Sequence, residues 1–347
     1  MSKTSFVHQL QTSNKPIFFL LRPILKITSA IYGLITHGRN VAYRYNILKS
    51  KSLITPVISV GNIIAGGTGK TPTVIWLIQN FPLDFPKAIL LSRGYGGDEQ
   101  QIFAKTLPDV PHFTGSKRFD AAQRALKEYG ENIVFVLDDG FQHQQLQRDL
   151  DIVLIDATCP FGYKHMLPRG FLREYLSNLK RADAFIITRS DMVTAQQLEN
   201  IQRKLKYIAG EKPQAISQHV PAYFVEHSSK RICDKNSFVG KRALLFCGIG
   251  NPQSFYYLVE NLGIEVVELK IFDDHYQYNA EDIADICSAA REVDMIITTS
   301  KDAVKIREHD LEGPLWILEI TIDVIKGKEQ LMKLVEDKIK ERQDTQG

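Results

Sequence analysis

One loop constrains the fold of this chain more than any other stretch of its sequence. Residues 57–79 read VISVGNIIAGGTGKTPTVIWLIQ, a β-branched run followed by a glycine-rich loop and an apolar helical pattern. Glycines let backbone N–H groups converge on phosphate oxygens, and a helix starting near Pro72 adds the positive end of its dipole. A strand, a glycine-rich loop and a helix in this order predict a phosphate-binding loop, or P-loop, for a nucleotide.

The residues of this loop have distinct expected roles. Lys70 is expected to reach the β- and γ-phosphates, and the hydroxyl of Thr71 is expected to bind Mg²⁺. The usual pattern has a glycine at the position of Ile64 in this chain. We expect the nucleotide to be bound by Ile64, Ala65, Gly66, Gly67, Thr68, Gly69, Lys70 and Thr71.

A pair of acids follows a second apolar run. In NIVFVLDDGFQH, residues 132–143, the strand-like run ends at Asp138 and Asp139. Buried strand ends rarely carry two adjacent carboxylates unless a cation or a cationic side chain balances them. The alternative is an acid pair on a surface loop. We interpret the pair as the acidic partner of the P-loop, with Gln142 and His143 beside it.

Two further stretches are polar where a simple fold does not require it. LPRGFLRE, residues 167–174, contains Arg169, Arg173 and Glu174, and the forked guanidinium group of arginine matches phosphate geometry. ITRSD, residues 187–191, is similar to the strand-end motif whose Asp reads a base in some P-loop proteins.

The order of the apolar runs predicts the fold class. Strand-like runs alternate with helical segments, and their apolarity is continuous, which is typical of a parallel sheet covered on both faces. We predict an α/β fold with a P-loop NTPase-like parallel-sheet domain, a second, smaller α/β domain and an N-terminal membrane-associated helix. The predicted boundaries are 1–50 for a basic amphipathic leader, 51–212 for the P-loop core, 213–238 for a linker, and 239–347 for the smaller domain with its C-terminal helix.

The leader is both apolar and basic. Residues 1–83 contain nine Lys or Arg and no Asp or Glu, whereas the remaining 264 residues carry 34 basic and 40 acidic residues. Charges interrupt the apolar run, so no stretch approaches the ~20 uncharged residues that a membrane span requires. An apolar helical face with flanking cations suits a helix lying in an anionic membrane interface; the alternative is a helix packed on the core of the protein. The apolar face comprises Ile24, Ile27, Ile31, Leu34 and Ile35.

These segments together resemble the tetraacyldisaccharide 4'-kinase family of Gram-negative bacteria. The resemblance covers nearly the whole chain, in the order YRYNIL, SVGNIIAGGTGKTP, LSRGYGG, GDE, LDDGFQH, LPRGFLRE, FDDHYQY and TTSKDAVKI. The family shares the missing first glycine of the loop. Two departures are a shorter segment between SRGYGG and GDE, and Ser300 where members usually have Glu.

The resemblance implies a function. It implies ATP- and Mg²⁺-dependent phosphorylation of the 4'-hydroxyl of tetraacyldisaccharide 1-phosphate to form lipid IVA, on the cytoplasmic side of the inner membrane. The implied partners are the acylated disaccharide lipid and the membrane surface, with no nucleic acid and no evident protein partner.

The resemblance also implies roles for individual residues. Asp98 is the expected catalytic base, oriented by His275, and Glu99 is the alternative acid because the loop before it is short. Lys70 and Arg173 complete the expected catalytic set. The expected metal ligands, directly or in the surrounding shell, are Thr71, Asp138, Asp139 and Glu174.

Two other function classes compete with this reading. A P-loop GTPase switch or metal chaperone would use ITRSD as a base-reading motif, but the sequence has no Cys/His cluster for handling a metal. A nucleic-acid ATPase would need basic and aromatic residues across its cleft domains, and residues 84–347 carry a net charge of −6.

Overall fold

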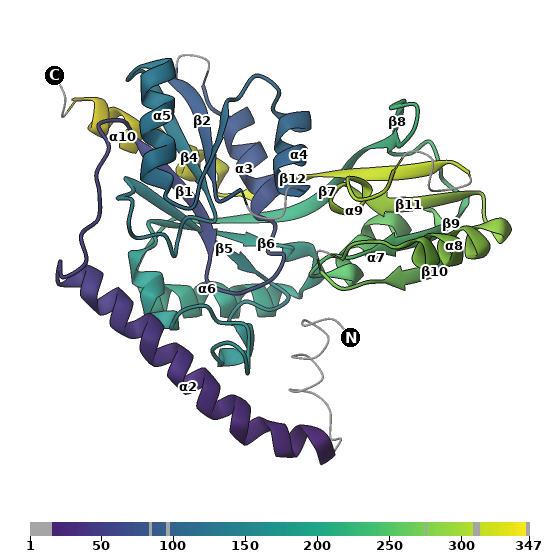
Figure 1. The fold of residues 1–347 in the computed structure, drawn as a ribbon, viewed down its shortest axis with the longest axis horizontal. Coiled ribbons are helices and arrows are strands. Elements are labelled where there is room, and N and C mark those ends of the chain that lie inside the picture. The colour runs from purple at the N-terminus through teal and green to yellow at the C-terminus, as the bar shows by residue number, and fades with distance from the viewer. Residues whose placement is uncertain (1–15, 83–84, 95–97, 275, 308–312, 345–347) are drawn as a thin grey trace. The chain divides into compact units, whose positions relative to one another are not determined.

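The chain folds into two compact units. The computed structural model describes residues 16–82, 85–94, 98–274, 276–307 and 313–344 (Figure 1). Of the described residues, unit 1 comprises those within 98–105 and 219–322, and unit 2 comprises those within 16–94, 106–218 and 323–344.

Unit 2 contains a parallel sheet with the strand order β6-β5-β1-β4-β2-β3. Every residue of β1, β4, β5 and β6 is buried, which confirms the parallel sheet predicted from continuous apolar runs. The strands are β1 (Val57–Asn62), β2 (Lys87–Ser92), β3 (His112–Thr114), β4 (Ile133–Asp138), β5 (Leu150–Asp156) and β6 (Ala184–Thr188). The described helices are α2 (Pro16–Arg44), α3 (Lys70–Gln79), α5 (Arg118–Tyr129), α6 (Ala195–Ala209) and α10 (Lys328–Asp344), with 3₁₀ turns at Gly162–Lys164, Leu176–Arg181 and Ser190–Met192.

Unit 1 has its own core around Phe224, Leu245 and Trp316. Its strand order is β10-β9-β11-β12-β7, in which β10, β9, β11 and β12 are parallel and β8 pairs antiparallel with β7. The strands are β7 (Gln214–Glu226), β8 (Ile232–Asp234), β9 (Arg242–Cys247), β10 (Glu265–Ile271), β11 (Met295–Thr299) and β12 (Leu315–Lys326), and β7 and β12 each belong partly to both units. The helices are α4 (Asp98–Thr106), α7 (Pro252–Glu260), α8 (Ala280–Ala289) and α9 (Ser300–Ala303), with a 3₁₀ turn at Ala290–Glu292.

The predicted linker 213–238 contains strands instead. β7 extends through 13 residues of it and β8 follows. Ala215 and Ile216 are buried at one end of β7, and Phe224 and Val225 are buried at the other. Two prolines and many polar residues suggested a linker, but burial of these apolar side chains stabilises the segment as a strand of the sheet.

The C-terminal helix belongs to unit 2, although the sequence reading grouped it with residues 239–347. Leu331, Val335 and Ile339 form its buried stripe. Arg342 donates a hydrogen bond of 2.7 Å to the Ser52 hydroxyl and lies 3.7 Å from the Asp149 carboxylate. These contacts join α10 to residues more than 190 positions earlier, which a local pattern does not reveal.

Helix α4 falls within unit 1, although the sequence reading grouped it with the P-loop core. Glu99 lies 3.2 Å from Lys301, and Lys105 lies 2.7 Å from Glu319. The hydroxyl of Ser300 also donates to Glu319, at 2.7 Å. Charged contacts more than 200 positions apart therefore attach α4 to this unit.

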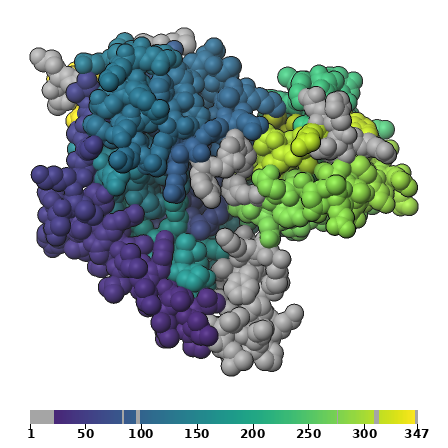
Figure 2. Space-filling view, in the orientation of Figure 1, coloured from purple at the N-terminus to yellow at the C-terminus, as the bar shows by residue number. Residues whose placement is uncertain are grey.

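Helix α2 packs on unit 2 through its polar face. The buried hydroxyl of Ser29 donates to the carbonyl of Met166 at 2.7 Å and accepts from the N–H of Arg169 at 3.0 Å. Asn40 is buried on the same side. Figure 2 shows the purple surface of α2, and its exposed apolar side chains are Ile24, Ile27, Ile31, Leu34 and Ile35, between 54 and 71% accessible.

Candidate active site

The glycine-rich loop connects β1 to α3 in unit 2. Gly66 and Gly69 adopt φ values of 112° and 88°, which side chains other than glycine rarely tolerate. Helix α3 begins at Lys70, directly after Gly69. The predicted strand, loop and helix are all present.

Residues 162–174 line the start of this loop. The N–H of Ala65 donates to the carbonyl of Phe171 at 2.8 Å, and the N–H of Arg173 donates to the carbonyl of Ile63 at 2.9 Å. Two segments a hundred residues apart are thereby joined, and Arg173 is brought to the mouth of the loop.

Asp139 lies at the centre of a cluster of cations. Arg173 forms two hydrogen bonds with its carboxylate, at 2.7 and 3.1 Å, and also donates to Asn62 at 3.1 Å. The Lys70 ammonium is 3.7 Å from the same carboxylate. Burial opposes ionisation of Asp139, but Lys70 and Arg173 outweigh it and hold the pKa of that carboxyl well below its usual value. Cationic side chains therefore balance the carboxylate of Asp139.

The turn that carries Asp139 fits closely against β1. A Cβ atom on Gly61 would lie 2.6 Å from the Cβ atom of Phe141, so only glycine permits this approach. Gln142 then donates to the carbonyl of Asn62 at 2.8 Å. The acids are thus held beside the strand that leads into the loop.

Further basic groups surround the acids. Arg118, 5% exposed at the start of α5, interacts electrostatically with Asp139, Arg93 and Asp138. Burial, followed by the charge of Arg118, lowers the pKa of His143 to about 4, so its imidazole is neutral at pH 7. This region has an excess of positive charge suited to nucleotide phosphates.

Thr71 and Asp138 fit a magnesium ion held largely by its nucleotide. Thr71 lies in the first turn of α3, and Asp138 pairs across the sheet with Val60 of β1. Both offer the hard oxygen ligands that Mg²⁺ prefers, and Mg²⁺ is usually bound by one or two such side chains together with phosphates and water. Among the described residues, no three His, Cys, Asp or Glu side chains are grouped to hold a metal.

The contacts of Glu174 differ from those expected of a metal ligand. Its side chain is fully buried, and one carboxylate oxygen accepts from Asn40 and Asn178, each at 2.8 Å. Arg181 donates to both oxygens, at 3.2 and 2.9 Å. Because its oxygens are already engaged, we remove Glu174 from the metal set and assign it to the attachment of α2. The sequence could not reveal this because Asn40 is 134 positions away.

Replacing Glu174 with glutamine tests this assignment. We expect the free energy of unfolding to fall by about 1–3 kcal/mol, because Arg181 loses its anionic partner and an amide donor replaces an acceptor. Urea unfolding monitored by circular dichroism measures this. The matched control is Glu199→Gln on α6, which removes an exposed pair with Arg203 and should change stability by less than about 0.5 kcal/mol. Stability equal to the control, with a raised Mg²⁺ requirement for activity, would return Glu174 to the metal set.

The other predicted site residues have different outcomes. Asp98 begins α4, but its side chain and the whole of His275 lie outside the described residues. Arg169 contributes its N–H to the packing of α2. Sequence reasoning missed Asn62 and Arg118. The polar residue ending an apolar strand at VGN was a usable signal for Asn62, whereas the buried position of Arg118 had none.

The fold and the site together define a P-loop nucleotide-binding enzyme of the α/β class. The family model for Tetraacyldisaccharide-1-P 4'-kinase matches residues 21–340. The tetraacyldisaccharide 4'-kinase of Halothermothrix orenii is 36% identical over 90% of this chain and 91% of its own length, and that of Syntrophus aciditrophicus is 34% identical over 87% and 89%. The crystal structure of LpxK from Aquifex aeolicus in complex with ATP is 28% identical, with a TM-score of 0.69, and covers 92% of this chain and 99% of that one.

The chain belongs to the tetraacyldisaccharide 4'-kinase family. It is an ATP-using kinase of lipid A biosynthesis, which confirms the resemblance drawn from its motifs. The family assignment also decides against the GTPase switch and the nucleic-acid ATPase.

Proposed function

We propose that the enzyme transfers the γ-phosphate of ATP, bound by unit 2, to the 4'-hydroxyl of tetraacyldisaccharide 1-phosphate while α2 rests on the cytoplasmic face of the inner membrane. The product is lipid IVA. The proposal rests on one observation. Two adjacent residues, Arg173 and Glu174, contact the phosphate site and the exposed apolar helix, respectively. Arg173 binds Asp139, and Glu174 binds Asn40 of α2.

The residues of unit 2 divide the phosphate chemistry among them. Backbone N–H groups of residues 66–69 and the ammonium of Lys70 would hold the phosphates, while Thr71 and Asp138 would hold Mg²⁺. Magnesium supplies charge neutralisation on the phosphate oxygens. Arg173 stabilises the charge that develops during transfer, since it is already drawn to the site by Asp139.

The acceptor hydroxyl must lose its proton as the new oxygen–phosphorus bond forms and ADP leaves. From the family resemblance, we propose that the Asp98 carboxylate accepts this proton and that His275 orients that carboxylate. The nearest alternative, Glu99, forms an ion pair with Lys301. A carboxylate committed to a lysine is less available to accept a proton, which supports Asp98.

The packing of α2 supports membrane contact. An amphipathic helix that served only the core would bury its apolar face, whereas α2 buries Ser29, Gly33 and Asn40 and exposes its isoleucines. Among the described helices, none has the length and apolarity needed to cross a bilayer. These properties suit a helix that lies in the interface, where each nearby Lys or Arg adds about 1 kcal/mol of attraction to anionic lipid.

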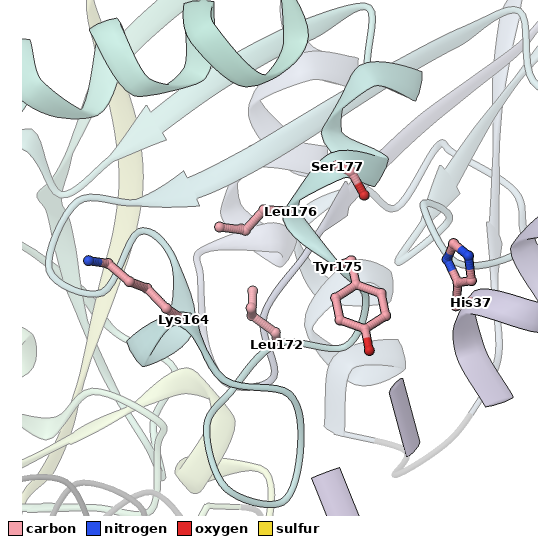
Figure 3. Close-up of a pocket in the computed structure, with 6 residues that line it drawn as sticks. All are labelled: His37, Lys164, Leu172, Tyr175, Leu176 and Ser177. Atoms are coloured by element: carbon pink, nitrogen blue, oxygen red, sulfur yellow. The ribbon is translucent and has the colours of Figure 1, made fainter. Parts of the chain in front are cut away.

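A pocket beside α2 suits the acyl part of the acceptor. Figure 3 shows its lining: His37 comes from α2, and the other residues come from the segment after β5. Its volume is about 540 Å³, within the usual range for ligand sites. Apolar surface from Leu172 and Leu176, with an ammonium group from Lys164, suits an acyl chain and an anionic headgroup. The lining residues are His37, Lys164, Leu172, Tyr175, Leu176 and Ser177.

Changing Ile27, Ile31 and Leu34 together to Asp should release the enzyme from anionic vesicles. Three exposed apolar contacts are lost and three negative charges repel the lipid. Co-sedimentation with phosphatidylglycerol vesicles measures binding, and unchanged ADP affinity verifies that the nucleotide site is intact. The matched control changes the exposed residues Gln196, Glu199 and Arg203 of α6 to Asp. Undiminished vesicle binding by the α2 variant would contradict membrane docking.

The catalytic function itself is tested by phosphate transfer. We would incubate the protein with γ-labelled ATP and the disaccharide 1-phosphate in detergent micelles and separate the lipids by chromatography. Labelled bisphosphorylated lipid is the expected product. An acceptor whose 4'-hydroxyl is blocked is the control, and equal labelling of that acceptor would contradict transfer to the 4' position.

A further inference from the structure

Three side chains at strand ends hold the underside of the P-loop. The Arg189 guanidinium donates to the carbonyl of Gly67 at 2.7 Å, and the buried Thr188 hydroxyl donates to the carbonyl of Thr68 at 3.0 Å. The amide of Asn62 donates to the Thr68 hydroxyl at 2.7 Å. Two successive carbonyl groups of the loop therefore face into the protein, where each has a donor.

Arg189 is fixed in place by a second contact. Its other terminal nitrogen forms an ion pair with Asp156, and both side chains are more than nine-tenths buried. Asp156 also accepts from the N–H and the hydroxyl of Thr158, at 3.0 and 2.7 Å. The planar guanidinium fork thus spans the end of β5 and the loop, and no single ammonium group could reproduce its geometry.

The backbone of Arg189 supports the same reading. Its φ of 54° lies in the left-handed region, which arginine seldom occupies. Thr188 pairs with Asp156 across the two strands, so the turn after β6 directs Arg189 back between Asp156 and the loop. The left-handed conformation of Arg189 therefore allows its side chain to contact both Asp156 and the loop.

The anchored carbonyls determine where the loop N–H groups point. In a trans peptide the C=O of one residue and the N–H of the next point in opposite directions. With the Gly67 and Thr68 carbonyls turned inward, the N–H groups of Thr68 and Gly69 are turned outward. That is the orientation that a bound phosphate requires.

We propose that Arg189, held by Asp156, is a positioning residue for ATP: it fixes the peptide planes of the P-loop so that their N–H groups face the phosphates. The inference rests on the nucleotide site proposed above. The positive charge of Arg189 is neutralised by Asp156, so its role is orientation and not attraction of phosphate. The motif ITRSD thereby acts on the phosphate part of the nucleotide through Arg189.

Arg189→Met, Arg189→Lys and the double variant Arg189→Met/Asp156→Asn test this proposal. Affinities for MgADP and for inorganic tripolyphosphate are measured by calorimetry, at a temperature where thermal melts show each variant to be folded. We expect Arg189→Met to lose roughly 10- to 100-fold in affinity for both probes, the usual worth of a charged hydrogen bond. Arg189→Lys should recover little. The double variant should bind no worse than Arg189→Met, because the two residues act as one unit.

Two control variants, Arg203→Met and Lys70→Ala, separate the possible outcomes. Arg203→Met, on the exposed face of α6, should leave both affinities unchanged. Loss of MgADP affinity with tripolyphosphate affinity retained would show that Arg189 contacts the nucleoside, and a lowered melting temperature with both affinities intact would show a purely structural role; either result overturns the proposal. If Lys70→Ala also keeps full affinity, the nucleotide site itself is misassigned, whereas loss in Lys70→Ala alone would refute only the role of Arg189.

Discussion

Lys70→Ala should reduce turnover by roughly 10²–10³-fold or more, the largest loss that we expect from a single change in unit 2. Lys70 begins α3 directly after the left-handed Gly69, and its ammonium lies 3.7 Å from Asp139 with only 16% of the side chain exposed. It is the one lysine in the loop sequence, residues 64–71. Without it, the developing charge on the transferred phosphate loses its closest point charge, which Arg173 alone cannot replace.

Steady-state rates with saturating acceptor and varied MgATP measure this loss. Thr71→Ala should instead raise the Mg²⁺ concentration needed for half-maximal rate, because it removes a proposed metal ligand and leaves the charges in place. Lys127→Ala, an exposed lysine of α5, is the matched control and should retain full activity. If Lys70→Ala turned over nearly as fast as the unchanged enzyme, the assignment of this loop as a P-loop would be wrong.

Asp98→Ala should cost roughly 10²–10⁴-fold in turnover, the usual contribution of a general base, with little loss of ATP affinity. Asp98 begins α4, which belongs to unit 1 and is attached there through Glu99–Lys301 and Lys105–Glu319. The proposed base therefore belongs to a different unit from the P-loop. Its loss should leave nucleotide binding in unit 2 unaffected.

The comparison with Glu99→Ala is the decisive control. Glu99 holds α4 through Lys301, so its removal should cost less than the removal of Asp98. Asp98→Ala/His275→Ala should be scarcely slower than the slower single variant, because a base and the residue that orients it act together. Near-normal turnover in Asp98→Ala together with loss in Glu99→Ala would show that the base is one position later in the chain.

Much of unit 2 was predictable because its signals are local. The apolar run that precedes Asp138 coincides with β4, since a strand buried on both faces is largely apolar. The glycine-rich loop and the acids at the end of β4 were predicted for a similar reason. In each case a few neighbouring residues supply both the backbone conformation and the charged side chains of the feature.

The partners of the site residues were not predictable. Glu174 resembled a metal ligand until the structure brought Asn40, Asn178 and Arg181 to its carboxylate. Arg189 resembled part of a base-reading motif, and its contact with Gly67 lies 122 positions away in the chain. Such contacts depend on which strands lie side by side, and no local pattern encodes that order.

The sequence by itself determined the nucleotide loop, the acid pair and the class of the enzyme, because short-range hydrogen bonding and apolar periodicity specify them. Only the tertiary structure decided that α2 buries its polar face and that α4 and α10 belong to units other than those the sequence suggested. The physical reason is the same in each case. A helix has two faces and two ends, and its partners are chosen by long-range complementarity of charge and shape, which exists only once the chain has folded.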